Sequence, residues 1–323
     1  MTYSDLMRLA NNYAESRTLL IAVELGIFTV LGQGVRRVNE MARRCRTTTE
    51  GMRLLLNALV GLGLIAVRNG LYRNCLLART YLDERSPRRV TDLMWLLTHH
   101  WSDWTQMSGA IRRGRPGWSP VTDTQAFRRR FALAMHGRSH ALAQATLATI
   151  RLPRRHVRLL DLAGGPGSYS IALAERYPKL TGLLVDQSVS VARALIKRSR
   201  LQHRLALREG DVFATKLGSG YDAVLVANLI HDFDEKDNRR LLARVHGALK
   251  PGGKLFIVEF FLDHSLTKPV EAAVFSLLMY KFTPGGRAYG WREVEGWLKD
   301  FGFGRFRRRP VRGAIGTLEA TRL

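Results

Sequence analysis

The chain has 323 residues, which is long enough for two domains with complete hydrophobic cores. Apolar residues make up 46% and charged residues 24%, the composition of an ordinary soluble globular protein. The two cysteines exclude a disulfide framework and a cysteine metal cluster. The most apolar early run, 19–31, contains Glu24 and is too short to span a bilayer. We therefore expect a cytoplasmic protein without a metal site or a membrane segment.

The formal net charge is +24, because 51 Lys and Arg residues face 27 Asp and Glu residues. Such a charge suits an anionic partner, such as nucleic acid, a membrane surface or an acidic substrate. The basic clusters are short and scattered, and arginine exceeds lysine, as an arginine-rich genome would give. We favour a basic surface without a dedicated partner, and nucleic acid remains an alternative.

The N-terminal part of the chain reads as helices followed by a hairpin. Apolar positions at helical spacing predict one or two helices over 4–31, and two more over 38–45 and 50–62. Two short apolar runs then flank the dipeptide Asn69-Gly70, which is typical of a tight hairpin turn. Three helices and a hairpin indicate a winged-helix unit, a fold that often binds DNA.

Two longer helices are expected over residues 90–115 and 124–150. The first carries Trp104 and the second carries Met135, each within a stripe of aromatic, histidine or methionine side chains. Such stripes more often pack in a core than line a ligand site. Both residues are therefore weak candidates for a binding site.

From residue 153 onward strands and helices alternate, which predicts a doubly wound α/β sheet with mostly parallel strands. The stretch 157–167 reads as a buried strand and a glycine turn, and a helix follows over 168–177. Glycines let the backbone approach a ligand and the helix start offers free amide donors, so this turn predicts a nucleotide site. The dinucleotide fingerprint is incomplete, because Ser170 stands where its third glycine would be.

Three aspartates lie at or near the ends of the first three strands of this region, and their order is typical of a site for S-adenosylmethionine. Asp161 precedes the small–small–Gly–x–Gly turn by two residues. Asp186 ends the second strand, where a carboxylate can bind both hydroxyls of a ribose. Asp211 follows the third strand, but an aspartate after Gly210 is also a common turn residue.

His231 follows the strand expected over 221–229, at the sheet edge where active sites of α/β proteins lie. A histidine in that place can act as a general base, although a surface or capping histidine is also possible there. A phenol has a pKa of about 10 and a histidine about 6.5, so full deprotonation before attack would cost about 5 kcal/mol. A base held against the hydroxyl can instead remove the proton as the new bond forms.

From Val157 to the C-terminus the chain resembles class I methyltransferases, in detail the small-molecule O-methyltransferases of the caffeate, hydroxyindole and bacterial natural-product type. The run 231–235, His-Asp-Phe-Asp-Glu, is similar to the family's His-Asp-Trp-x-Asp/Glu signature, which carries the general base. The run 53–65 resembles the family's N-terminal module. The resemblance implies S-adenosylmethionine as cofactor and a homodimer acting on a small molecule. It divides the chain into a winged-helix dimerisation domain (1–85), linking helices that contribute to the substrate pocket (86–152) and a catalytic domain (153–323).

The resemblance also implies roles for individual residues. His231 is the base and Glu259 orients its ring; Asp161 braces the glycine loop, Asp186 holds the ribose, and Asp211 with Phe213 holds the adenine. The implied cofactor contacts are Asp161, Gly164, Gly165, Gly167, Asp186, Asp211, Val212, Phe213 and Asn228. The implied substrate contacts are Trp104, Met135, Phe275, Met279 and Tyr289.

One position departs from the family pattern. A second glutamate normally follows the stretch Met…Pro-Gly-Gly-Lys/Arg, and here Ala288 stands in its place. Without that carboxylate the base is held less firmly, which leaves several alternatives open. They are a weaker O-methyltransferase, a different acceptor atom (carbon or nitrogen), and a family member repurposed for other chemistry. Separately, the net charge of +24 leaves methylation of nucleic acid as an alternative, and the winged-helix unit leaves a DNA-binding regulator as another.

Overall fold

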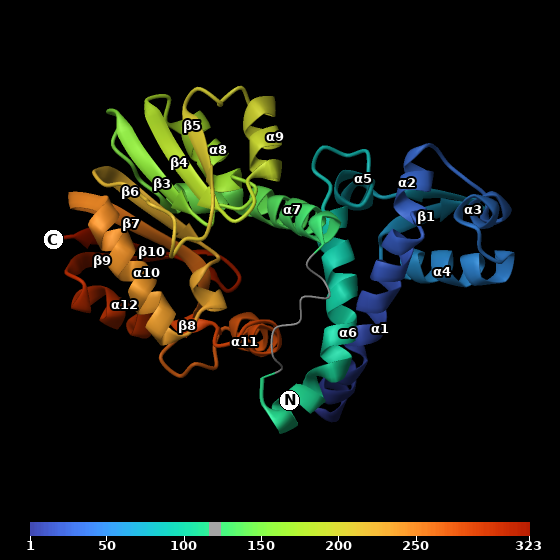
Figure 1. The fold of residues 1–323 in the computed structure, drawn as a ribbon. Coiled ribbons are helices and arrows are strands. Elements are labelled where there is room, and N and C mark those ends of the chain that lie inside the picture. Colours follow the sequence, from blue (N-terminus) through green and yellow to red (C-terminus); the bar gives the residue numbers. More distant parts are fainter. Residues whose placement is uncertain (116–123) are drawn as a thin grey trace. The chain divides into compact units, whose positions relative to one another are not determined.

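The structure is a computed structural model that describes residues 1–115 and 124–323 (Figure 1). Its contacts divide the chain into two compact units, Met1–Ser102 and Asp103–Leu323. The boundary falls inside the helix α6 (Thr91–Arg113). Within the described residues, no helix combines the length and the apolar character that crossing a bilayer requires.

The first unit is mainly helical. Its elements are α1 (Tyr3–Glu24), α2 (Ile27–Gly32), α3 (Val38–Cys45), α4 (Thr49–Gly61), β1 (Ile65–Arg68), β2 (Leu71–Asn74), α5 (Leu76–Tyr81) and the first half of α6. The two strands pair antiparallel around Asn69 and Gly70, which both adopt positive φ, as the turn type of this dipeptide requires. A buried apolar cluster, which includes Phe28, Met41 and Leu56, holds the unit together. The expected helices and hairpin are confirmed.

The second unit contains the sheet that was expected from the alternating pattern. Its elements are the second half of α6, α7 (Gln125–Thr149), β3 (Val157–Leu162), α8 (Ser168–Arg176), β4 (Leu180–Asp186), α9 (Ser190–Arg198), β5 (Leu205–Glu209), β6 (Tyr221–Ala227), a short 3₁₀ turn (Ile230–Asp232), α10 (Glu235–Ala248), β7 (Leu249–Leu262), α11 (Val270–Phe282), β8 (Tyr289–Gly290), α12 (Trp291–Asp300), β9 (Phe303–Arg312) and β10 (Ile315–Arg322). By contacts, α7 belongs to this unit, while the three-part division expected from the sequence remains a prediction.

The sheet has the strand order β5-β4-β3-β6-β7-β10-β9, and β8 adds a short pairing to β7. The strands from β5 to β7 are parallel, whereas β10 runs antiparallel between β7 and β9. Side chains alternate along β3, so that Leu160 packs in the cluster with α10 and α12, and Leu159 packs in the cluster with α7, α8 and α9 (Figure 1). Helices therefore cover both faces, and the carboxyl ends of the parallel strands meet at one edge.

A Lys-Pro-Gly-Gly run at residues 250–253 is typical of a turn between a helix and a strand. In the structure these residues lie within the long strand β7 instead. The register against β6 jumps there, since Tyr221 pairs with Leu249 but Ala223 pairs with Lys254. The Pro-Gly-Gly sequence thus forms an irregularity inside the strand, where Gly252 takes a φ of +73°.

Candidate active site

The carboxyl edge of the parallel strands gathers most of the site residues expected from the sequence. The loops after β3, β5 and β6 carry the glycine turn, Asp211 and His231 respectively, and Asp186 is the last residue of β4. Glu259 lies on the neighbouring strand β7, and α11 carries Phe275 and Met279. Parallel strands produce this gathering, because all of them end at the same edge.

The glycine loop after β3 is tightly built around Asp161. This carboxylate is 1% exposed and accepts a hydrogen bond from the Ser170 hydroxyl at 2.6 Å. A Cβ at Gly164 would lie 2.7 Å from the carboxyl carbon of Asp161, so only glycine fits beside it. Burial raises the pKa of Asp161 to about 7, although the Ser170 hydrogen bond opposes the shift. Asp161 therefore packs against the loop, and its role in a cofactor site remains a prediction.

The other face of the glycine loop is open. Gly165 has a φ of +51°, and a Cβ built there would meet nothing within 4 Å. Gly167, with a φ of +74°, forms the N-cap of α8 and offers no side-chain hydrogen bond to the first turn of that helix. An open backbone without side chains, beside uncapped amides, suits a ligand that approaches the main chain. The loop therefore fits the methionine part of S-adenosylmethionine.

Asp186 connects the loops after β3 and β4. Its Oδ2 accepts a hydrogen bond from the Gly165 amide at 2.8 Å, and its Oδ1 accepts one from the Ser188 amide at 3.0 Å. Burial raises the pKa of Asp186, and these two backbone hydrogen bonds oppose the shift. The sequence assigned the bracing of the loop to Asp161 alone, but Asp186 shares that role.

Asp211 is exposed and forms a turn. Its Oδ1 accepts hydrogen bonds from the amides of Phe213 at 2.6 Å and Ala214 at 3.3 Å. This geometry matches the turn interpretation of the residue. The ring of Phe213 meets that of Phe233 edge to face, with the ring centroids 5.0 Å apart. Contact of Asp211, Val212 and Phe213 with the adenine remains a prediction.

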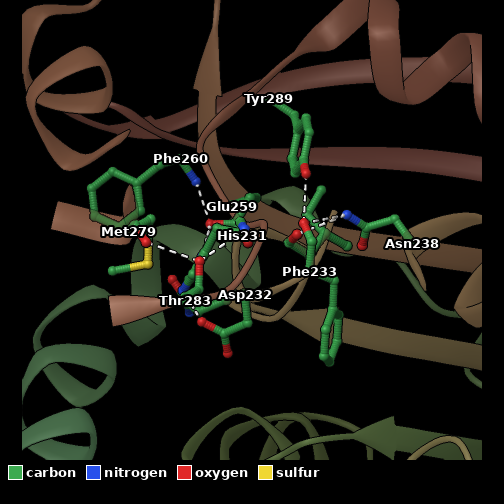
Figure 2. A network of polar contacts seen from close by, with 12 residues as sticks. His231, Asp232, Phe233, Asn238, Glu259, Phe260, Met279, Thr283 and Tyr289 are labelled. Atoms are coloured by element: carbon green, nitrogen blue, oxygen red, sulfur yellow. Dashed lines mark hydrogen bonds and ion pairs between the residues drawn. The ribbon is translucent and has the colours of Figure 1, made fainter. Parts of the chain in front are cut away.

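His231 and Glu259 form the central pair of the site (Figure 2). The imidazole Nδ1 lies 2.7 Å from Glu259 Oε1, and His231 is 7% and Glu259 0% exposed. A carboxylate only accepts hydrogen bonds, so Nδ1 carries the proton and Nε2 is left to accept one. Nε2 faces the Asp232 carboxylate at 3.5 Å, and the Asp232 side chain is 47% exposed. The arrangement fixes the orientation of the His231 ring through Nδ1 and leaves Nε2 facing an exposed carboxylate.

The charges around His231 tune its basicity. Burial by itself lowers the pKa of His231, but the nearby carboxylates of Glu259 and Asp232 outweigh burial, so the pKa is raised. The Arg138 guanidinium acts in the opposite direction. A raised pKa makes the neutral ring a stronger base, and it moves the pH at which the ring becomes neutral upward.

Aromatic side chains enclose the base. Phe275 meets the His231 ring edge to face at 4.8 Å and stacks on Phe260 at 4.3 Å. Met279 lies one turn beyond Phe275 on α11 and is 8% exposed. The structure therefore brings Phe275 directly to the ring of His231, while the contacts of Phe275 and Met279 with substrate remain predictions.

Tyr289 is a correction to the expected substrate contacts. Its side chain is 1% exposed, its ring packs against Trp297, and its hydroxyl donates a hydrogen bond to the Phe233 carbonyl at 2.5 Å (Figure 2). A tyrosine whose ring lies in the core and whose hydroxyl is already paired supports the loop that carries His231. The motif position alone did not reveal this packing.

Two residues that the sequence analysis did not single out hold the same loop. Asn238 is 0% exposed, and its amide nitrogen donates to the carbonyls of Ile230 at 2.9 Å and Phe233 at 3.1 Å. Gly286 packs so closely on the loop that a Cβ there would lie 1.9 Å from the His231 carbonyl oxygen. In the sequence, the only signal for Asn238 was a polar residue near the start of a helix. The only signal for Gly286 was its place in the Pro-Gly-Gly run.

We expect Gly286→Ala to displace the His231 loop, because the added methyl group cannot coexist with the carbonyl oxygen. The free energy of unfolding should fall by about 1–3 kcal/mol, the usual cost of overpacking. Gly296→Ala is the matched control: it lies inside α12, its Cβ would meet nothing within 4 Å, and it should stabilise by about 0.5–1 kcal/mol. Denaturant unfolding of both variants checks this, and equal stabilities would contradict the close packing.

Ala288 lies in a small apolar cluster. It is 0% exposed and packs with Leu262, Ala272 and Ala314, next to Phe260 and Phe275. Its amide donates to the Ser276 hydroxyl at 3.0 Å. At the position where the sequence analysis expected a second glutamate, a buried alanine packs against apolar side chains. The carboxylate bonded to Nδ1 of His231 is that of Glu259.

Two candidate substrate contacts lie on α6 and α7. Within the described residues, neither shows a contact with His231 or Glu259. Trp104 is 39% exposed on α6. Met135 is half-buried on α7 and precedes Arg138 by three positions, so the two share a helix face. Asn228, the last of the expected cofactor contacts, has a φ of +52° and accepts a hydrogen bond from Arg138 at 2.8 Å. All three roles remain predictions.

A sheet of this order, with a glycine loop after its first strand and a paired histidine at the same edge, defines a class I methyltransferase. Comparison with known protein families agrees: residues 99–304 match the O-methyltransferase domain, and residues 7–84 match the O-methyltransferase dimerisation domain. The chain belongs to the S-adenosylmethionine-dependent O-methyltransferase family.

Individual relatives cover nearly the whole chain. The chain is 31% identical to the 3-hydroxy-5-methyl-1-naphthoate 3-O-methyltransferase of Streptomyces sahachiroi, over 92% of this chain and 88% of the relative. It is 29% identical to the acetylserotonin O-methyltransferase of Gallus gallus, over 90% of this chain and 92% of the relative. The solved structure of an O-methyltransferase family protein from Burkholderia thailandensis is similar, with a TM-score of 0.86, 25% identity and coverage of 100% of this chain and 98% of that one.

Proposed function

We propose that this protein transfers a methyl group from S-adenosylmethionine to a hydroxyl of an aromatic or polyketide-like small molecule, with His231 as the general base. The observation that carries the proposal is the 2.7 Å pairing of His231 Nδ1 with the buried Glu259, at the same sheet edge as the open glycine loop. The relatives named above act on a hydroxynaphthoate and on acetylserotonin, which supports an aromatic acceptor.

The chemistry divides between the cofactor and the chain. When bound, S-adenosylmethionine supplies an electrophilic methyl group on a sulfonium. The chain must hold the acceptor hydroxyl in line with that methyl group and remove its proton. His231 Nε2 accepts the proton, while Glu259 keeps the opposite nitrogen protonated and stabilises the imidazolium that forms. Phe275 and Phe260 fix the face of the ring and limit water near it.

The N-terminal segment supports a homodimer. Residues 7–84 match the dimerisation domain of the family, and α1 exposes apolar side chains that a partner chain could cover, among them Leu6, Leu9 and Tyr13. We propose a homodimer formed through the winged-helix domain of residues 1–85, with residues 86–152 as linking helices that contribute to the substrate pocket and residues 153–323 as the catalytic domain.

Binding of S-adenosylhomocysteine tests the cofactor part of the proposal. In calorimetric titrations we expect the wild type to bind S-adenosylhomocysteine and to show no binding of NAD. Asp186→Ala should weaken binding by about 10- to 150-fold, because hydrogen bonds to a charged group contribute about 1.5–3 kcal/mol. Asp300→Ala, which removes a 58% exposed carboxylate on α12, is the control and should bind as the wild type does. No binding by the wild type would refute the proposed function.

A further inference from the structure

Arg138 brings a positive charge into the interior of the site. It lies on α7, and its Nη2 donates a hydrogen bond to Asn228 Oδ1 at 2.8 Å. Its guanidinium carbon lies 5.1 Å from the centre of the Phe260 ring. Phe260 stacks on Phe275, and Phe275 touches the ring of His231. The guanidinium therefore lies beside the aromatic side chains that enclose the base.

The same helix also reaches the glycine loop. His136, two residues before Arg138, has its Nδ1 2.8 Å from the hydroxyl of Ser168, the first residue of α8. Arg138 interacts electrostatically with Glu259 and also with Tyr169, the second residue of α8. The charge of Arg138 thus lies between the start of α8 and the catalytic pair. The start of a helix also favours a negative charge, because its first amides are free.

The charge of Arg138 is not balanced by an ion pair. Among the residues that the structure describes, no carboxylate lies within the 4.0 Å of an ion pair with it. Its guanidinium has five N–H donors, and within residues 1–115 and 124–323 one of them is hydrogen-bonded, to Asn228. Arg138 is half-buried. A partly buried cation without an ion pair loses solvation that no protein charge replaces, so we expect it to meet an anion in the working complex.

We propose that Arg138 binds a carboxylate of a molecule in the active site. Carboxylate is the anion that matches the planar fork of a guanidinium, and it can come from either of the two molecules that meet at His231. One source is the amino acid part of S-adenosylmethionine, and the other is an acceptor that carries a carboxylate on its aromatic ring. The inference rests on the proposed function and adds a recognition residue to it.

The first arm of the test examines the cofactor. S-adenosylhomocysteine and 5′-methylthioadenosine share the adenosine and the thioether, but only the former has a carboxylate. Calorimetric titration of both ligands is carried out on the wild type, Arg138→Gln and Arg138→Lys. The quantity compared is the affinity for S-adenosylhomocysteine divided by the affinity for 5′-methylthioadenosine. If the cofactor is the source, Arg138→Gln should lower the ratio by about tenfold or more, and Arg138→Lys should lower it less, because lysine keeps the charge but loses the fork.

The second arm examines the acceptor. With S-adenosylhomocysteine saturating, 3-hydroxy-1-naphthoate and its carboxamide are titrated into the same proteins. If the acceptor is the source, the wild type should prefer the carboxylate, and Arg138→Gln should remove about tenfold or more of that preference. A wild type that shows no preference excludes the acceptor, and the proposal then depends on the first arm.

Controls separate the possible failures. Arg129→Gln removes an exposed arginine from the same helix and should leave both ratios within about twofold of the wild type. If Arg138→Gln does not fold, Arg138→Lys decides, with a fall of about threefold or more in one ratio expected. Unchanged ratios in folded Arg138 variants overturn this inference alone. Failure of the wild type to bind S-adenosylhomocysteine overturns the proposed function instead.

Discussion

Replacement of His231 by alanine should lower kcat by about 10²- to 10⁴-fold, because the acceptor hydroxyl then has no base beside it. Affinity for S-adenosylhomocysteine should stay within about twofold of the wild type, since the glycine loop and Asp186 are untouched. The assay is the transfer of a labelled methyl group to a hydroxylated aromatic acceptor, under single-turnover conditions that isolate the chemical step.

His264→Ala is the matched control, because His264 is an exposed histidine of the same unit. It should leave kcat unchanged. A His231→Ala variant that keeps more than about a tenth of the wild-type rate would show that another group removes the proton, and it would remove His231 from the proposed function.

The pH dependence of the Glu259→Gln variant should separate two effects of Glu259 on His231: its orientation of the imidazole ring and the effect of its charge on the pKa of that ring. The carboxylates of Glu259 and Asp232 raise the pKa of His231 against the effect of burial. In the wild type, activity should therefore increase with pH through a pKa above the ordinary value of about 6.5, as the ring becomes neutral. Removing the charge of Glu259 should move this increase to lower pH. The plateau rate should also fall by about tenfold or more, because a glutamine can hold the wrong tautomer.

The same variant has a consequence for stability. A pKa that is raised on folding contributes stability below about pH 6.5, the unfolded value, and that contribution disappears as the pH rises through the folded value. Glu259→Gln should remove the contribution, so the wild type should exceed the variant in stability by more at pH 5 than at pH 9. Glu271→Gln, an exposed glutamate in the first turn of α11, should change neither profile. A pH–rate profile of Glu259→Gln that coincides with the wild type would contradict the role of the pair.

Much of this protein is determined by patterns that are local in the sequence. Alternating strands and helices specify a parallel sheet, and parallel strands must end at one edge, so the gathering of the glycine loop, Asp186 and His231 could be predicted. The hairpin at Asn69-Gly70 and the limits of α3 also follow from neighbouring residues, because turn chemistry and helical periodicity act over short distances.

Other features depend on residues that are far apart in the chain. Tyr289 is in the core because its hydroxyl meets the Phe233 carbonyl, and Gly286 is required because the His231 carbonyl occupies the space of a side chain. Arg138 lies 93 positions before His231 in the sequence, on a helix whose pattern indicated only packing. Its contact with Asn228 arises when α7 packs on the sheet edge. The sequence pattern gives the periodicity of each helix and strand, but it does not give the partner that each side chain contacts. Tertiary packing therefore decides which polar groups come together in the active site.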